Sequence, residues 1–559
     1  MKKYLVKNKT VLTLICLMVL GAFLRYYNLN WGAPYYFHPD ERNIASSISQ
    51  LKFPGQMNPN FFAYGSLPIY TVYFTGVLLN LVRYFQLTFN QPNDNFQIPF
   101  DQAIFIGRFF SAFFSILIIA LIYKIGKKIH SEKVGLLAAF LASSSVGFIQ
   151  FSHFGTFEIW ITFFCLLLIW TAIKLSHQIS IKALILTGLI LGILISTKIS
   201  NILFVILPLF SILISAFNKI PEERYRFVLF KKISFKFLSS FLILGSASLI
   251  YLISNPFTFL DFPSFENSIN YESKVATGAI DVFYTHEFFD TIPVLYHFKY
   301  IYPFLLNPLI TVLFIPSFFY IFWISVKSKN KNYLLLISCY LLLFLSQAFL
   351  FVKWTRYMVP TLPFIYLIVS ILITDLFLNN PKLSSIKYQV LSIVSIISLI
   401  FTFSYFVTVL AKPDNRVAAA EWAKQNIPSN SKIISETYDL GIIAFNPNLH
   451  NIVLCDFYNS EKSDDLCNNT PLSQTLSNTE YIILPSERLL KMAQLKKTRF
   501  PKRYLIYTSF FDITKYKLIF KSPCDFYCKI IYINNPMLSF EQTVNVFDNP
   551  TVYIFKKIK

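Results

Sequence analysis

Long apolar runs separated by short polar segments dominate the first 410 positions of the chain. Eleven of these runs, at roughly 15 to 23 residues each, reach or come near the length needed to cross a hydrocarbon core about 30 Å thick as helices. We therefore predict a polytopic helical membrane region over residues 1–411. The expected spans cover approximately 11–27, 102–123, 134–151, 158–175, 183–197, 201–217, 237–255, 303–325, 333–351, 359–377 and 388–410.

The stretch LPIYTVYFTGVLLNLVRYF, at 67–85, lies between the first two spans and is also apolar. A full crossing there would reverse the side on which every later loop lies. We therefore expect it to form an amphipathic or re-entrant helix at the membrane interface. It belongs to a long first outer loop, residues 28–101.

From residue 412 onward polar residues, prolines and asparagines return, and the pattern becomes that of a small soluble α/β domain over 412–559. Residues 415–439 predict a helix, a turn and a strand, and residues 479–494 predict a strand followed by a helix. Three later segments, YKLIFKSP, CKIIYINNP and TVYIFKKIK, have the composition of strands.

Composition agrees with an integral membrane protein, because 55% of the 559 residues are hydrophobic and only 14% are charged. The formal net charge of +21 does not indicate a nucleic-acid-binding protein, because the basic residues are spread over short clusters between the apolar runs. Nucleic acid is not an expected partner.

The basic clusters occupy alternate loops, and Lys and Arg are retained on the cytoplasmic side of a membrane. The cytoplasmic segments are expected to be MKKYLVKNK, YKIGKKIHSEK, KLSHQISIK, NKIPEERYRFVLFKK, KSKNKN and NNPKLSSIK. The odd number of spans then places the C-terminal domain outside the cytoplasm, together with YYFHPDER, SHFGTFE and VKWTRYMVP. We expect a multi-pass protein of the cell membrane with a cytoplasmic N-terminus.

Cys16, Cys165 and Cys339 lie within predicted spans, and the other four cysteines lie in the C-terminal domain. An even number in an oxidising compartment favours two disulfides, with the nearer neighbours paired as a guess. A zinc site is the alternative, although CDFYC has one residue more than the usual Cys-x-x-Cys spacing.

Adjacent carboxylates, Asp40 and Glu41, stand in the first outer loop. A carboxylate whose pKa is set by local burial and nearby cations can act as a general base. The alternative interpretation is structural, because Pro39, Asp40 and Glu41 also have the pattern of a helix start, where acids oppose the helix dipole.

Several cations are expected at the outer ends of spans. A charge as deep in a span as Arg108 is costly unless it is paired, so it marks a candidate site. Arg356 is a second candidate, whereas Lys198 and Lys353 could equally extend to lipid headgroups. Further candidates in the outer loops, each with a structural alternative, are His153 and Glu158.

Acids and cations therefore converge on the outer face, where ATP and nucleotide sugars are absent. An enzyme working there needs an activated group carried on a lipid, and a polyprenyl-phosphate sugar fits, because its phosphate leaving group is stabilised by Arg or Lys. The acceptor is then a protein, a lipid or a glycan.

No Asp-x-Asp pair stands in the first loop, so no cofactor or divalent metal is required. The aromatic residues Tyr35, Tyr36, Phe61 and Tyr64 are candidates for sugar stacking or for interface anchoring.

Six motifs in this order resemble the glycosyltransferase C superfamily, in particular its branch of dolichyl-phosphate-mannose protein mannosyltransferases and bacterial aminoarabinose transferases. The motifs are HPDE at 38–41, YGSLPIY at 64–70, IGRFFSA at 106–112, SHFGTFE at 152–158, LISTK at 194–198 and KWTRYMVPTLPF at 353–364. His38 and Tyr357 lie within them and join the candidate site residues.

The resemblance implies a polyprenyl-phosphate sugar donor, inversion at the anomeric carbon and Asp40 as the base. It also implies that Arg108, Arg356 and Lys198 contact the donor phosphate. Relatives often have Asp near the position of Glu158, which leaves the role of that residue open. The alternative function is a transporter or flippase of a lipid-linked precursor, which would place ionisable residues near mid-membrane in two related halves.

Overall fold

The computed structural model describes residues 2–86, 96–215, 225–379 and 386–558. All eleven expected spans are mainly helical over their described residues, and eight helices are long and apolar enough to cross a membrane. These eight are α1 (Lys2–Tyr26), α4 (Phe100–Ile129), α7 (Glu158–His177), α10 (Tyr225–Ser254), α15 (Pro308–Ser328), α16 (Lys331–Ala348), the continuous stretch Thr355–Leu378 and the stretch that begins with α19 (Lys387–Tyr405). The stretch Thr355–Leu378 consists of α17 (Thr355–Met358), η4 (Val359–Thr361), α18 (Leu362–Ile373) and η5 (Thr374–Leu378).

The other three expected spans differ from straight membrane-length helices. The third divides into α5 (Glu132–Ser143) and α6 (Val146–Ser152), which are bent by 53° at a break where the Ser145 side chain caps α6. The fifth is α8 (Ile181–Thr197), and the sixth is η1 (Ile199–Val205) followed by α9 (Ile206–Ser215). Within the described residues, eight helices are thus long and apolar enough to be spans, or nine if the bent pair is one span, and the expected eleven is not established.

Close packing of α8 against α10 explains why so short a helix stays in the bundle. A Cβ on Gly188 would lie 2.5 Å from the carbonyl oxygen of Ile243, and a Cβ on Gly192 would lie 2.7 Å from that of Ala247. Two small residues four positions apart let the backbones approach, which is a frequent way for membrane helices to associate.

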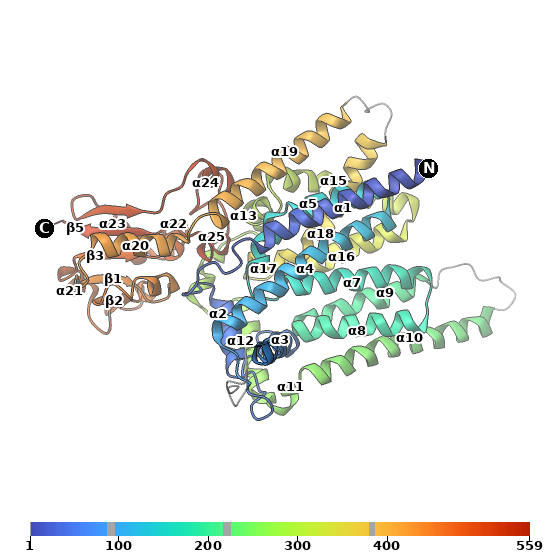
Figure 1. Ribbon diagram of the computed structural model, residues 1–559, viewed down its shortest axis with the longest axis horizontal. Helices are drawn as coiled ribbons and strands as arrows, with labels where there is room; N and C mark the ends of the chain where they lie inside the picture. Colours follow the sequence, from blue (N-terminus) through green and yellow to red (C-terminus); the bar gives the residue numbers. More distant parts are fainter. Residues whose placement is uncertain (1, 87–95, 216–224, 380–385, 559) are drawn as a thin grey trace.

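At one end of the bundle lie α2 (Pro39–Ser49), α3 (Ser66–Gln86), α11 (Phe257–Leu260) and α12 (Phe262–Thr277) (Figure 1). The long bundle helices run across the view of Figure 1, whereas α3 is seen nearly end-on. Helix α3 therefore crosses the bundle direction, in agreement with the expected interfacial helix. Short helices η3 (Phe283–Phe288), α13 (Leu295–Tyr300) and α14 (Tyr302–Leu305) complete the segment between α12 and α15.

The C-terminal region contains a five-stranded sheet of order β2-β1-β3-β5-β4. Its strands are β1 (Ile433–Glu436), β2 (Ile452–Cys455), β3 (Tyr481–Leu484), β4 (Tyr516–Lys521) and β5 (Tyr553–Lys557). Strands β2, β1 and β3 are parallel, and β5 runs antiparallel to β3 and β4. Helix α19 continues into η7 (Phe406–Leu410) before this region begins. The helices of the region are α20 (Asn415–Asn426), η8 (Leu440–Ala444), η9 (Phe457–Asn459), α21 (Leu472–Ser477), α22 (Arg488–Leu495), α23 (Pro501–Phe510), α24 (Phe526–Ile531) and α25 (Thr543–Val546).

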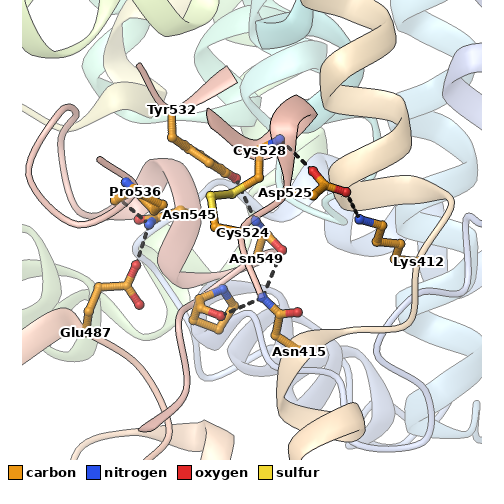
Figure 2. The surroundings of a disulfide bond; sticks show 11 residues. Lys412, Asn415, Glu487, Cys524, Asp525, Cys528, Tyr532, Pro536, Asn545 and Asn549 are labelled. Atoms are coloured by element: carbon orange, nitrogen blue, oxygen red, sulfur yellow. Dashed lines mark hydrogen bonds and ion pairs between the residues drawn. A yellow bond between two sulfur atoms is a disulfide. The ribbon is translucent and has the colours of Figure 1, made fainter. Parts of the chain in front are cut away.

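One expected strand is wrong. The segment CKIIYINNP contains most of helix α24, because the Asp525 side chain accepts a hydrogen bond from the Cys528 backbone N–H and starts a helix there. Cys524 and Cys528, four positions apart, form a disulfide across this turn (Figure 2). The second disulfide joins Cys455 to Cys467, so the guess that nearer neighbours pair is confirmed.

A continuous apolar core joins the bundle to the sheet, and it includes residues as distant as Ile122 and Ile554. The N-terminus lies at the end of the bundle opposite the sheet (Figure 1). The candidate residues of the outer loops lie between these two parts of the molecule.

Candidate active site

The two adjacent acids of the first loop begin helix α2. His38 is the N-cap, its Nδ1 accepts a hydrogen bond from the Glu41 N–H at 3.4 Å, and Pro39 takes the first helical position. The structural interpretation of this motif is therefore correct. Successive helical side chains point in different directions, so Asp40 and Glu41 reach different surroundings.

Asp40 faces Arg356, and their side chains form an ion pair in which they are 27% and 28% exposed. Burial alone would raise the pKa of the Asp40 carboxyl, but the charge of Arg356, with smaller contributions from His38, Lys198 and Arg488, lowers it below its ordinary value. The carboxylate form is therefore stabilised. It is the ionic state that a general base requires.

Arg356 and Lys198 have hydrogen-bonding capacity that the protein does not use. The Nε of Arg356 is buried and has no partner among the described residues. The Lys198 ammonium is 5.3 Å from the ring centroid of Tyr64 and 5.2 Å from that of Tyr357, and within the described chain it has no hydrogen-bond or ion-pair partner. Such unpaired donors at a half-buried position suit an anionic ligand.

Two cavities meet at Arg356 and Tyr357. One is a groove of about 420 Å³ with mainly apolar walls from η1, α12, α16 and η4, and Lys198 and Glu158 also line it. The other has a volume of about 570 Å³, contains Asp40 and is bounded by the first loop, α12 and the C-terminal region. The arrangement places a mainly apolar groove on one side of Arg356 and a cavity with a larger polar share, which contains Asp40, on the other.

Glu41 and Arg108 are bound to each other, in place of the contacts with acceptor and donor that the sequence indicated. The Arg108 Nε and Nη2 donate to the two Glu41 oxygens, each at 2.6 Å, and Nη1 donates to the carbonyl oxygens of Leu29 and Trp31. Both side chains are buried, at 1% exposure or less, and neither lines the two cavities. The ion pair with Glu41 offsets the free-energy cost of burying the Arg108 charge in α4, so Arg108 needs no ligand.

Glu158 lies at the edge of the groove, at the start of α7. Its Oε1 accepts a hydrogen bond from the Tyr64 hydroxyl at 2.8 Å, and its buried Oε2 has no partner in the described part of the chain. The aromatic residues expected to stack on sugars do not line either cavity, and Tyr284 and Trp354 line the Asp40 cavity instead.

His153 and Lys353 lie apart from Asp40 and line neither of the two cavities. The ring nitrogens of His153 each lie 2.8 Å from a backbone carbonyl oxygen, one of Ile149 and one of Tyr27. The Lys353 ammonium donates to the carbonyl oxygen of Phe351, and burial with the nearby charge of Lys496 lowers its pKa to about 8. Both residues have structural contacts.

The sequence interpretation missed Arg488 and Glu272. Arg488, from the C-terminal region, lines the Asp40 cavity, while Glu272 of α12 lines both cavities. A cation at the first position of α22 is unfavourable for a helix dipole, which was a signal that Arg488 serves another purpose. Across the described ranges, no group of three or more His, Cys, Asp or Glu side chains is placed to hold a metal ion.

Comparison with known proteins gives one family match. Residues 96–244 match the family model described as dolichyl-phosphate-mannose-protein mannosyltransferase. The comparison with curated proteins gives no match.

Solved structures give likenesses over most of the chain. The apo oligosaccharyltransferase of Archaeoglobus fulgidus has a TM-score of 0.51 at 12% identity, and the alignment covers 98% of this chain and 88% of that one. Apo ArnT from Cupriavidus metallidurans has a TM-score of 0.47 at 12% identity, with 88% and 95% of the two chains covered.

The bundle of membrane helices and the small C-terminal sheet thus share the fold of the Archaeoglobus fulgidus oligosaccharyltransferase. The expected resemblance is confirmed by the family match: the chain is a polytopic membrane protein with this fold, and its residues 96–244 are similar to the dolichyl-phosphate-mannose-protein mannosyltransferase family.

Proposed function

We propose that the protein transfers a sugar from a polyprenyl-phosphate donor to an acceptor hydroxyl of a protein, lipid or glycan at the outer face of the cell membrane, with inversion. The observation that carries this proposal is the position of Arg356 and Lys198. Both line an apolar groove between helices, and Arg356 also forms an ion pair with Asp40. The matched family model, named for enzymes of a lipid-phosphate sugar, supports the same donor class.

The groove suits the lipid part of the donor, because side chains such as Leu203, Leu342 and Leu343 line it. Its cations suit the phosphate, since the free donors of Arg356 and the Lys198 ammonium can bind phosphate oxygens and stabilise the charge that develops on the leaving group. Glu158 and Glu272 also line the groove.

Asp40 serves as the general base. When the donor phosphate binds Arg356, the positive charge that lowers the Asp40 pKa is partly neutralised, while burial continues to raise that pKa. The carboxylate then becomes a better proton acceptor. It takes the proton of the acceptor hydroxyl as that oxygen bonds to the sugar C1, and the C1–phosphate bond breaks with its electrons remaining on the polyprenyl phosphate.

The test is Asp40→Asn in the purified full-length protein in lipid nanodiscs, assayed against a panel of polyprenyl-phosphate sugars. Turnover should fall by about 100-fold or more, because a general base typically contributes that much. Undecaprenyl phosphate should bind at least as tightly as to the wild type, because Arg356 loses its internal partner. Asp101→Asn, an exposed acid at the start of α4, is the matched control. Wild-type turnover in Asp40→Asn would reject Asp40 as the base.

A further inference from the structure

A residue of the C-terminal region contacts the start of the span that bears Arg356. The Glu541 carboxylate is fully buried, and its Oε2 accepts hydrogen bonds from the Thr355 backbone N–H at 3.3 Å and the Thr355 hydroxyl at 2.7 Å. Thr355 is the first residue of α17, and the two residues are 186 positions apart.

Helix α17 lacks a cap of its own. Trp354 occupies the N-cap position and makes no capping hydrogen bond from its side chain. The first N–H groups of a helix need hydrogen-bond acceptors. Glu541 supplies one from outside the helix.

Arg356 follows Thr355 directly, so the capped turn determines where its guanidinium lies. That guanidinium binds Asp40 on one side and lines the apolar groove on the other. A small rotation of this first turn would separate Arg356 from both Asp40 and the phosphate position.

The segment that bears Glu541 is itself fixed. The Glu541 N–H donates to the Tyr300 carbonyl oxygen at 3.0 Å, and the Gln542 N–H donates to Glu287 Oε2 at 2.9 Å. Glu287 in turn forms a buried ion pair with Lys491 at 2.8 Å. The cap is therefore held by contacts on both the bundle and the sheet region.

Gln542 also links this segment to the Asp40 cavity. Its Oε1 accepts a hydrogen bond from the Arg488 Nε at 3.1 Å, and its Nε2 donates to the Tyr284 carbonyl oxygen at 2.7 Å. Arg488 and Tyr284 both line that cavity. Residues 541–542 thus contact Thr355, which precedes Arg356, and two residues that line the Asp40 cavity.

We propose that the C-terminal region completes the donor-phosphate site, with Glu541 as a positioning residue that acts on Arg356 through Thr355. This inference rests on the proposed function, because it takes Arg356 as the phosphate ligand. It assigns the C-terminal region a part in donor binding, separate from any contact with the acceptor.

The experiment measures the dissociation constant of undecaprenyl phosphate for full-length variants in nanodiscs, together with their melting temperatures. Glu541→Ala should weaken binding by about tenfold, the usual scale for loss of a helix cap. Glu541→Gln should retain most of the affinity, because its side-chain oxygen still accepts from Thr355. Equal losses in the two variants would overturn the inference.

Glu487→Ala is the matched control. Glu487 is equally buried in the C-terminal region, but it accepts hydrogen bonds from Asn545 and the Thr551 N–H and does not contact α17. Glu487→Ala should lower the melting temperature and leave phosphate affinity unchanged. If it weakens binding as much as Glu541→Ala, the Glu541 effect is general instability and the inference fails.

Two further variants separate the possible failures. Added to Arg356→Ala, Glu541→Ala should cause no further loss of affinity, whereas additive losses would contradict action through Arg356. If Arg356→Ala alone binds normally, the phosphate assignment itself is wrong. If Glu541→Ala does not fold, Thr355→Val removes one of the two bonds without changing the shape of the side chain, and an unchanged affinity there would overturn the inference.

Discussion

Two neighbouring carboxylates in this protein have opposite environments. Glu41 is enclosed with Arg108, which uses its donors on Glu41 and on two backbone carbonyls. Asp40 lines a cavity and pairs with Arg356, whose Nε remains unpartnered within the described residues. A sealed pair can only stabilise the fold, whereas an open pair with spare donors can exchange its partner for a ligand.

The pH dependence of kcat/KM should report the Asp40–Arg356 pair. The Asp40 pKa is below its ordinary value of 3.8, so the base form is lost only as the pH falls through that lowered pKa, and the acidic limb should lie below pH 3.8. Arg356→Gln should move this limb to higher pH, because burial still raises the pKa and the main opposing charge is gone. Arg488→Gln should move it less.

The measurement is a pH–rate profile of each full-length variant, with ionic strength held constant. Arg499→Gln, which alters an exposed side chain of the C-terminal region, is the control and should leave the limb in place. An acidic limb that does not move in Arg356→Gln would show that another group controls the rate.

At the scale of elements, the ends of helices place the site. His38 caps α2, Glu541 caps α17 from a distant part of the chain, and Lys198 follows the last turn of α8. The Glu41–Arg108 pair fastens α2 to α4 and thereby holds the first loop on the bundle. The candidate site residues are thus attached to helices near their first or last turns.

Breaking that pair should destabilise the protein. Arg108→Ala should lower the free energy of unfolding by about 3–5 kcal/mol, because it leaves a buried carboxylate without its partner. Replacing both residues, with Glu41→Gln and Arg108→Met, should recover part of the loss. Lys127→Ala, which breaks the exposed pair with Glu132, should have a much smaller effect.

Melting temperature and denaturant unfolding in detergent measure these differences. Undecaprenyl phosphate affinity should change little in any Arg108 variant that remains folded. A stable Arg108→Ala protein that no longer binds the phosphate would instead restore Arg108 as a donor ligand.

At the scale of the whole molecule, the two ends of the helix bundle differ in what lies there. The site and the sheet lie at one end of the bundle, and the N-terminus of α1 lies at the other (Figure 1). The basic loops predicted to be cytoplasmic alternate along the sequence with the predicted outer loops, and the first outer loop carries the adjacent acids. We therefore expect the site to face away from the cytoplasm, where only a lipid-linked donor can supply an activated sugar.

Cysteine labelling tests this orientation. Lys424→Cys, on the exposed face of α20, should react with a membrane-impermeant maleimide in intact cells, because α20 is expected outside. Lys329→Cys, between α15 and α16, should react only after permeabilisation. The reverse pattern would place the site in the cytosol, where soluble sugar donors are available.

The sequence alone determined the helices of the bundle and most of the sheet, because membrane length and the alternation of apolar residues are local properties. It also indicated Asp40, Arg356 and Lys198, since charges next to spans are costly and therefore informative. It was wrong about CKIIYINNP, where an Asp cap and a disulfide support a helix in residues with strand-like composition.

Only the tertiary structure decided which charges meet. Asp40 and Arg356 are 316 positions apart, Glu41 and Arg108 are 67 apart, and Glu541 reaches Thr355 across 186. Whether a buried charge binds a ligand or another side chain depends on the few ångströms between partners, and sequence spacing does not contain that distance. The sequence therefore indicated the charged residues of the outer loops, and the tertiary structure decided which of them pair with one another.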